Sequence, residues 1–231
     1  MQINKVFRQE RKFLINSEQY YRFCHQFSGV FHEDSHNVPG GYMVRSLYFD
    51  TLGERDYQEK IAGVECRRKM RLRVYTPGSS TALLEMKQKQ GSDQLKRSMK
   101  VSRAHAEELM NGRYESLLKY DDPFATECYG VLKMNTYLPK VIVEYNRMAF
   151  VFKENNIRIT FDSHISASKV TGRLFDEHSG CFPVMHPDSV VLEVKYNNFL
   201  LSYVKDVLRV SNKSEISVSK FALANEATFR F

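Results

Sequence analysis

The sequence lacks the marks of several large protein classes. Its four cysteines lie far apart, with no Cys-x-x-Cys pair and no histidine cluster at zinc-site spacing. No window approaches the roughly 18 uninterrupted apolar residues that a transmembrane helix needs, and the first residues lack the apolar stretch of a signal peptide. We therefore expect free thiols, no transmembrane segment and a cytoplasmic protein, with a peripheral position at the inner face of a membrane left open.

Several catalytic and binding motifs are also missing. The sequence contains neither Gly-x-x-x-x-Gly-Lys-Ser/Thr nor Gly-x-Gly-x-x-Gly, which disfavours P-loop and Rossmann nucleotide binding, and it has no Gly-x-Ser-x-Gly nucleophile elbow. The seven histidines are scattered along the chain, which disfavours a histidine-based catalytic or metal site. The usual signatures of nucleic-acid-binding domains are absent as well, and we expect no nucleic-acid partner.

What the sequence does have is positive charge. Lysine and arginine number 34 against 27 aspartate and glutamate residues, which gives a formal net charge of +7 and a pI near 9.1. This balance indicates acidic partners, such as phosphorylated metabolites or polyphosphate. The 231 residues, with 42% hydrophobic side chains, suit a single domain over residues 1–231 with a sizeable core.

The most informative pattern is a strict alternation between Val64 and Val74. One face of this predicted strand carries Glu65, Arg67, Lys69, Arg71 and Arg73. The opposite face is apolar apart from Arg68. Residues two apart in a strand share a face, which places the cations at intervals of roughly 6.6–6.8 Å. Because a buried row of cations needs counter-charges, the pattern predicts a dense anion along this strand.

About eight strands are predicted in all. They are Val6–Ile15, Tyr42–Asp50, Val64–Tyr75, Ala82–Lys89, Gln94–Ser102, Lys140–Phe152, Ile157–Asp162 and Val190–Tyr196. Glycine-containing turns near Gly78 and Gly91 join three of these strands as antiparallel hairpins. Predicted helices lie between the strands and at the end of the chain. The sequence therefore predicts an α+β fold in which an eight-stranded antiparallel sheet closes into a barrel.

Charge recurs at alternating positions of most of these strands, as in the pairs Glu10–Lys12, Glu85–Lys87 and Glu193–Lys195. For any single strand, the stronger interpretation is an ordinary solvent-exposed sheet face. Taken together, the strands favour a barrel with a polar, basic lumen and helices packed outside. Such a lumen suits a chain of phosphates with bound divalent metal. We therefore consider Glu10 and Glu85 as metal or water ligands, because they share faces with lysines.

Nine segments, in this order, carry a resemblance to a known family: FRQERKFLI, YMVRSLYFDT, ECRRKMRLRVY, LLEMKQKQ, QLKRS, VEYNRMAF, IRITFD, VLEVKY and SVSKF. Together they resemble the vacuolar transporter chaperone (VTC) polyphosphate polymerase domain, which belongs to the triphosphate tunnel metalloenzymes, or CYTH-like superfamily. The resemblance runs from about Phe7 to Phe221. It implies an eight-stranded antiparallel tunnel, Mn²⁺ or Mg²⁺ as cofactor, and transfer of the γ-phosphoryl of ATP to a polyphosphate chain.

The resemblance also implies site residues. Those expected to act in catalysis are Arg71, Arg73, Lys87, Arg147 and Arg158. Those expected to bind substrate are Lys12, Lys96, Tyr145, Ser219 and Lys220, and we add Lys195 because it shares a face with Glu193. The resemblance implies Glu193 as the metal ligand, beside our candidates Glu10 and Glu85. The implied partners are ATP, inorganic polyphosphate or triphosphate, and a membrane protein.

Two positions depart from related patterns. The triphosphatase and cyclase branch has Glu-x-Glu-x-Lys in its first strand, and here Arg8 stands at the first Glu position. The loss of that carboxylate favours the polymerase branch. Polymerase members tend to have a basic residue where this chain has Ser217, which makes one end of the expected tunnel less positive.

Two other functions remain open. The first is hydrolysis of inorganic or nucleoside triphosphates in the same fold, which would give orthophosphate instead of a polymer ladder. The second is a catalytically silent polyphosphate-binding module, which would bind polyanions in a salt-sensitive way without metal-dependent turnover.

Overall fold

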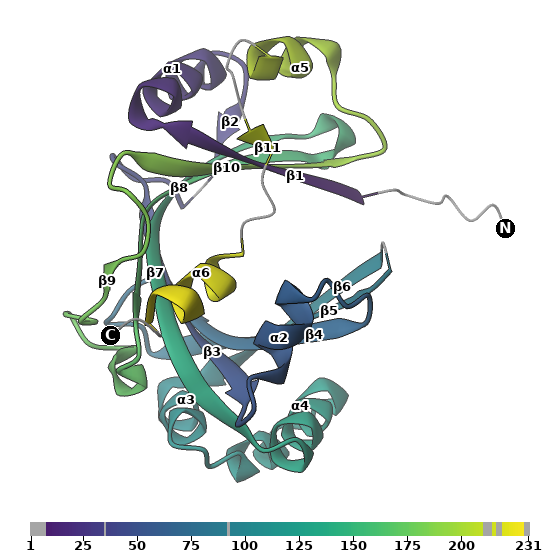
Figure 1. Ribbon diagram of the computed structural model, residues 1–231, viewed down its shortest axis with the longest axis vertical. Helices are drawn as coiled ribbons and strands as arrows, with labels where there is room; N and C mark the ends of the chain where they lie inside the picture. The colour runs from purple at the N-terminus through teal and green to yellow at the C-terminus, as the bar shows by residue number, and fades with distance from the viewer. Residues whose placement is uncertain (1–7, 35, 92, 210–213, 216–218, 229–231) are drawn as a thin grey trace, which may run out of the picture. The chain divides into compact units, whose positions relative to one another are not determined.

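The computed structural model of this chain describes residues 8–34, 36–91, 93–209, 214–215 and 219–228 (Figure 1). Its strands are β1 (Arg8–Asn16), β2 (His32–Glu33), β3 (Tyr42–Thr51), β4 (Arg67–Val74), β5 (Thr81–Gln90), β6 (Asp93–Ser102), β7 (Tyr137–Phe152), β8 (Ile157–Ser168), β9 (Phe182–Pro183), β10 (Ser189–Asn197) and β11 (Ser214–Glu215). Its α-helices are α1 (Ser17–Ser28), α2 (Arg55–Ile61), α3 (Arg103–Met110), α4 (Pro123–Met134), α5 (Ser202–Arg209) and α6 (Lys220–Thr228). No helix in these residues is long and apolar enough to cross a membrane.

The strands form a sheet whose order is β11-β1-β10-β8-β7-β3-β4-β5-β6, with β2 beside β7 and β9 beside β8. Every pair with a described register is antiparallel. Three strands have only two residues each, and the other eight are the long strands that the alternation predicts. Among the described residues this hydrogen-bonded path begins at β11 and ends at β6, so it does not close on itself. Closure into a barrel and a basic lumen remain predictions.

The chain forms two compact units. Unit 1 contains residues 1–43, 145–165 and 185–218, and unit 2 contains residues 44–144, 166–184 and 219–231. Strands β3, β7 and β8 contribute residues to both units. The single domain expected over residues 1–231 stays a prediction.

The core of unit 1 lies between α1, α5 and one face of the sheet (Figure 1). Helix α1 begins with a capping box, in which the Asn16 side chain accepts a hydrogen bond from the Gln19 backbone N–H at 2.8 Å. The N-cap of the helix is therefore Asn16. The helix buries Phe23 and Phe27 against Phe161 of β8.

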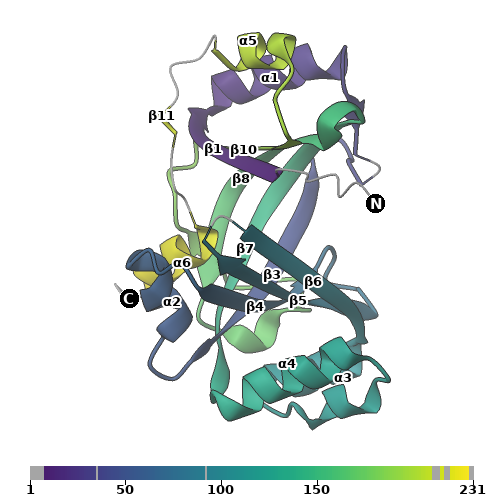
Figure 2. The same ribbon diagram turned by 90° about the vertical axis from the view of Figure 1, so that its right-hand side faces the viewer.

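The core of unit 2 lies on one face of strands β4, β5 and β6, against α3 and α4 (Figure 2). The alternating apolar side chains of these strands, such as Leu72, Leu84 and Val101, are fully buried there. The two helices contribute Leu109 and Leu132. Since side chains alternate between the faces of a strand, burial of this face leaves the charged side chains of the same strands on the other.

The four cysteines do not form disulfides: Cys24, Cys66, Cys128 and Cys181 are all free thiols. This agrees with the sequence interpretation. Burial raises the pKa of Cys128 to about 12, so this thiol is protonated and unreactive at neutral pH.

Candidate functional site

In unit 2, the second face of β4, β5 and β6 is strongly cationic. Its charged residues are Arg67, Lys69, Arg71 and Arg73 in β4, Glu85, Lys87 and Lys89 in β5, and Lys96 and Lys100 in β6. The strand register places Lys69 opposite Lys87, and Lys87 opposite Lys96. Like charges directly opposite each other across strands are destabilising. This row of three lysines therefore favours an anion bound across the strands.

Glu85 is the carboxylate within this face. The Arg71 Nε atom contacts its Oε2 at 2.6 Å, and the Arg73 Nε atom lies 3.8 Å from the same oxygen. Lys96 contacts the other oxygen. Burial alone would raise the pKa of Glu85, but Arg71, Arg73 and Lys96 outweigh this effect and lower it to about 2. Glu85 is thus ionised at neutral pH, and it holds the two arginines in place.

Side chains of β3 also position these arginines. The Tyr48 hydroxyl accepts a hydrogen bond from Arg71 Nη1 at 2.8 Å, and the Ser46 hydroxyl accepts one from Arg73 Nε at 3.1 Å. Burial acts to raise the pKa of Tyr48, but the nearby cations, chiefly Arg71 and Arg73, lower it. Sequence reasoning did not include Tyr48 or Ser46, although their alternation in YMVRSLYFDT was the signal that could have found them.

The start of α6 joins the same face. Lys69 Nζ donates a hydrogen bond to Ser219 Oγ at 2.8 Å and lies 5.2 Å from the centre of the Phe221 ring. Lys220 is the first residue of α6 and contributes to the lowered pKa of Tyr48. The predicted residues Ser219 and Lys220 are therefore brought together with the β4 cations. Ser217, the position where a basic residue was expected, lies outside the described residues.

In unit 1, the charged face is a ladder of alternating signs across β1 and β10. The register pairs Lys12 with Glu193 and Glu10 with Lys195. Lys12 Nζ lies 2.8 Å from Glu10 Oε1 and 3.5 Å from Glu193 Oε2. Lys195 contacts Glu193 and lies 4.0 Å from Glu10 Oε2. Burial acts to lower the pKa of Lys12, but the two carboxylates raise it above its usual value, so this lysine is charged.

Two arginines continue this face on β7 and β8. Arg147 forms two hydrogen bonds with the fully buried Asp162, at 2.6 and 2.8 Å, and lies over the Tyr145 ring at 5.2 Å. Burial acts to lower the pKa of Arg147, and Asp162 raises it well above its usual value. Arg158 is more exposed, and its Nη2 atom lies 2.8 Å from Asp34. Asp162 and Asp34 were not among the predicted site residues. Each contacts an arginine that is far from it in the sequence, so the pairing is visible only in the structure.

Thr160 lies on β8 between Arg158 and Asp162, and its hydroxyl has no partner among the described residues. It is 3% exposed and lies opposite Glu193 in the register of β8 and β10. Its Oγ1 atom forms no hydrogen bond with the described residues. A buried polar group left unpaired costs about 1–3 kcal/mol, so Thr160 is a position at which a polar ligand or water would be stabilised.

The predicted site residues thus divide evenly between the units. Unit 1 holds Glu10, Lys12, Tyr145, Arg147, Arg158, Glu193 and Lys195, and unit 2 holds Arg71, Arg73, Glu85, Lys87, Lys96, Ser219 and Lys220. The three candidate metal ligands divide likewise, with Glu85 in a different unit from the others.

A metal bound by protein groups alone would need more ligands than this face supplies. The described residues contain no group of three or more histidine, cysteine, aspartate or glutamate side chains that could hold a metal ion. The adjacent carboxylates of Glu10 and Glu193 nevertheless fit Mg²⁺ or Mn²⁺, since such ions are commonly held by one or two carboxylates together with substrate phosphates. The face fits an ion that arrives with its substrate.

Comparison with known proteins gives a family and a fold. The sequence profile of the VTC domain matches residues 7–229. A protein from Bacillus halodurans named as an adenylate cyclase has 11% identity and a TM-score of 0.55, over 92% of this chain and 95% of its own. A second similar structure is that of a Hippeastrum protein named as an adenylyl cyclase and described as having a dominant triphosphatase activity. It has 13% sequence identity and a TM-score of 0.59, over 96% of this chain and 95% of its own. At such identities the likeness shows the fold alone. No curated protein matches the chain.

Proposed function

The chain belongs to the VTC domain family, and from this premise we propose that it is a metal-dependent polyphosphate polymerase. In the proposed reaction, the γ-phosphoryl of ATP is transferred to the end of a growing polyphosphate chain. The observation that carries the proposal is the cationic face of unit 2, where the row of Lys69, Lys87 and Lys96 lies beside Arg71 and Arg73. A linear polyanion matches such a row better than a compact anion does.

The chemistry of phosphoryl transfer fits these residues. Its transition state spreads charge over the phosphate oxygens, so catalysis depends on holding the reactants in line and stabilising that charge. Guanidinium groups bind phosphate oxygens in a bidentate fork. Arg71 and Arg73 are already oriented by Glu85, Tyr48 and Ser46, so little ordering remains to be done when substrate binds.

No general base is required in this proposal. The attacking group is a terminal phosphate oxygen, which is already ionised at neutral pH. The proposed reaction therefore does not need a histidine or carboxylate to remove a proton, in agreement with the scattered histidines of the sequence.

The charged face of unit 1 is the proposed metal and phosphate site. Glu193 and Glu10 would hold Mn²⁺ or Mg²⁺, which would neutralise phosphate charge when bound. Lys12, Lys195, Arg147 and Arg158 are the proposed phosphate contacts of this face. Of these, Arg158 is the most exposed at 41% of its side chain, so it can reach an anion with the least rearrangement.

Triphosphate hydrolysis is the second candidate. The activity described for the Hippeastrum protein favours it, as do the paired carboxylates of Glu10 and Glu193. Against it stands Arg8, which replaces a carboxylate of the triphosphatase and cyclase pattern. A silent polyphosphate-binding module is the third candidate.

One incubation separates the three. Purified protein is mixed with ATP and Mn²⁺, with and without a pyrophosphate primer, and the products are resolved on a gel and assayed for orthophosphate. A polymer ladder supports the polymerase. Orthophosphate alone means a triphosphatase, and salt-sensitive polyphosphate binding without turnover means a binding module; either result overturns the proposal.

Variants from each unit link the activity to the proposed residues. Arg73→Ala and Glu193→Gln should each lower the turnover rate by about 10²–10³, the usual effect of removing one preorganised charge contact. Arg113→Ala, at an exposed position of unit 2, is the matched control. Circular dichroism checks that the variants fold. Turnover equal to that of the control in both variants would refute the assignment.

A further inference from the structure

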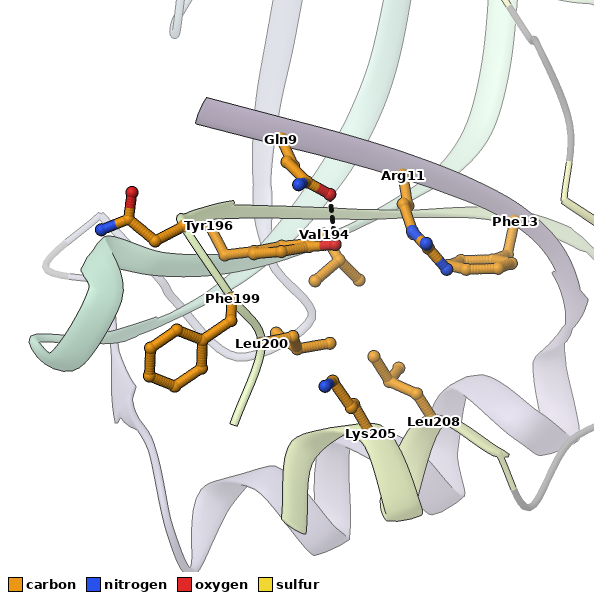
Figure 3. A pocket seen from close by; sticks show the side chains of 10 residues that line it. Gln9, Arg11, Phe13, Val194, Tyr196, Phe199, Leu200, Lys205 and Leu208 are labelled. Carbon is orange, nitrogen blue, oxygen red and sulfur yellow. Dashed lines mark hydrogen bonds between the residues drawn. The ribbon is translucent and has the colours of Figure 1, made fainter. Parts of the chain in front are cut away.

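A pocket of about 530 Å³ lies on the apolar side of unit 1, away from the charged ladder (Figure 3). It is lined by ten residues of β1, β10 and α5 and of the segment between β10 and α5, among them Arg11, Val194, Phe199, Leu200, Lys205 and Leu208. Its volume falls within the range of roughly 300–1,000 Å³ that is typical of small-molecule sites.

The pocket is on the opposite face of the strands from the proposed phosphate site. Side chains alternate along β1 and β10, so Arg11 and Val194 point away from the face that carries Lys12 and Glu193. A ligand in the pocket is therefore separated from the ladder by the thickness of the sheet. The inference drawn from it does not depend on the proposed function.

The walls of the pocket are largely apolar. Val194, Leu200 and Leu208 are buried, and Figure 3 shows their side chains facing the same space from β10, from the segment after it, and from α5. The Phe199 ring at the edge of the pocket is 59% exposed. A hydrophobic ligand could therefore pack against apolar side chains inside the pocket and against the exposed aromatic ring at its edge.

Two cations lie at this apolar pocket. Figure 3 shows Arg11 extending from β1 and Lys205 from α5, with the carbon atoms of Val194, Leu200 and Leu208 between them. Neither Arg11 nor Lys205 forms an ion pair with the described residues, and both are exposed. None of the ten lining residues is acidic. An anionic group of a ligand would therefore complement these two cations.

The side chain of Gln9, which also lines the pocket, adds a neutral hydrogen-bond donor. The Tyr196 hydroxyl donates to Gln9 Oε1 at 2.8 Å, which fixes the orientation of the Gln9 amide. The Nε2 group of Gln9 has no partner among the described residues and can donate to a ligand oxygen.

We propose that this pocket binds an anionic amphiphile of the fatty-acid type. Its aliphatic chain lies against Val194, Leu200 and Leu208, and the positive charge of Arg11 and Lys205 at the pocket attracts its carboxylate. Burial of the chain supplies most of the affinity, and the two cations select a negative head group.

Binding of decanoate and of decanol, which have the same chain length, tests the proposal in the full-length protein. Calorimetric titrations are done below the micellar concentration and with saturating tripolyphosphate, so that the cationic faces are occupied. We expect one decanoate per chain, bound at least about tenfold more tightly than decanol, and NMR shift changes in the methyl groups of Val194, Leu200 and Leu208.

Matched variants separate the charge from the apolar contacts. The double variant Arg11→Gln/Lys205→Gln should weaken decanoate binding about tenfold and leave decanol binding unchanged. The control Arg22→Gln/Lys153→Gln removes two exposed cations of the same unit that do not line the pocket, and should bind decanoate like the parent. Phe199→Ser should weaken both ligands.

Several results would overturn the proposal. These are equal affinity for decanoate and decanol, loss of decanoate binding when tripolyphosphate is added, methyl shifts confined to residues outside the pocket, or undiminished decanoate binding in the Arg11→Gln/Lys205→Gln variant. Failure of polymerase activity would not bear on any of them, so the two proposals can fail separately.

Discussion

Replacing Glu85 by glutamine should destabilise the protein and make its stability depend on bound phosphate. In the parent, this buried carboxylate contacts Arg71, Arg73 and Lys96. Glutamine keeps the shape of the side chain and removes its charge, so three neighbouring cations lose their common counter-ion. Removing one partner of a buried ion pair is strongly destabilising because it leaves charge uncompensated.

The magnitude follows from the pKa of Glu85, which is lowered from 4.5 to about 2. Each pKa unit corresponds to about 1.36 kcal/mol, so ionised Glu85 contributes roughly 3 kcal/mol to the free energy of unfolding. Because the folded-state pKa is depressed, this contribution is present above the unfolded-state pKa. It is lost as the pH falls from about 4.5 towards 2.

Urea unfolding at neutral pH, and over a series of acidic pH values, measures both effects. Glu85→Gln should lose about 3 kcal/mol at neutral pH and lack the parent's loss between pH 4.5 and 2. Glu65→Gln, at an exposed position of the same unit, is the control and should match the parent. The two variants would then differ in stability by the contribution of one buried carboxylate.

Tripolyphosphate adds a second readout. Its oxygens can replace the missing carboxylate among the cations, so it should stabilise Glu85→Gln more than it stabilises the parent. If Glu85→Gln is as stable as Glu65→Gln, or if tripolyphosphate raises the stability of both variants equally, Glu85 is not the counter-ion of a phosphate-binding face.

Three further substitutions test other parts of the structure. Burial raises the pKa of Asp56 to about 7, so the free energy of unfolding should fall as the pH rises from about 4 to 7. Asp56→Asn should remove this pH dependence, and urea unfolding with the same pH dependence in both proteins would contradict the prediction. Thr160→Val should raise the free energy of unfolding by about 1 kcal/mol, because it removes a buried hydroxyl that has no partner among the described residues, and it should also raise the KM for ATP. A loss of stability in thermal unfolding would mean that the hydroxyl has a partner. Gly41 has a φ of +89°, and an added Cβ would lie 2.7 Å from the Arg147 carbonyl oxygen, so Gly41→Ala should cost about 1–3 kcal/mol or more. Gly29→Ala, with a φ of −84° and no atom within 4 Å of its Cβ, is the control in the same assay, and equal stability of the two variants would refute the strain.

Alternation in the sequence was sufficient to predict the long strands and their charged faces. Val64–Tyr75 was expected as a strand, and β4 occupies Arg67–Val74 with the predicted face shared by Lys69, Arg71 and Arg73. Alternation is a local property with a period of two residues, so it requires no knowledge of the partner strand.

The contacts between side chains could not be predicted in the same way. The row of Lys69, Lys87 and Lys96 depends on the register of two hairpins, and a slip of one residue would move each lysine to the other face. The pairing of Lys12 with Glu193 joins the first strand to a strand near the end of the chain. Thr160 has no local signal at all, because its importance lies in the absence of a described partner for its hydroxyl.

The family resemblance predicted the VTC domain, and the profile match over residues 7–229 confirms it. It also supplied site residues, which the structure collects on two charged faces without testing their roles. What the resemblance could not supply was the supporting residues, such as Tyr48, Asp34 and Asp162. These side chains act by fixing arginines, and their effect is visible only from geometry.

The pairing of β1 with β10 has a consequence for synthesis on the ribosome. Residues 8–16 leave the exit tunnel long before their hydrogen-bonding partners at residues 189–197 are translated. Until then β1 has an unpaired edge, which is a template for association with other nascent chains. Pairing between strands so far apart in the sequence also gives a high contact order, for which slow folding is expected. Polysomes that carry this message should therefore engage chaperones at β1, and a ribosome stalled before residue 189 should present this strand to them continuously.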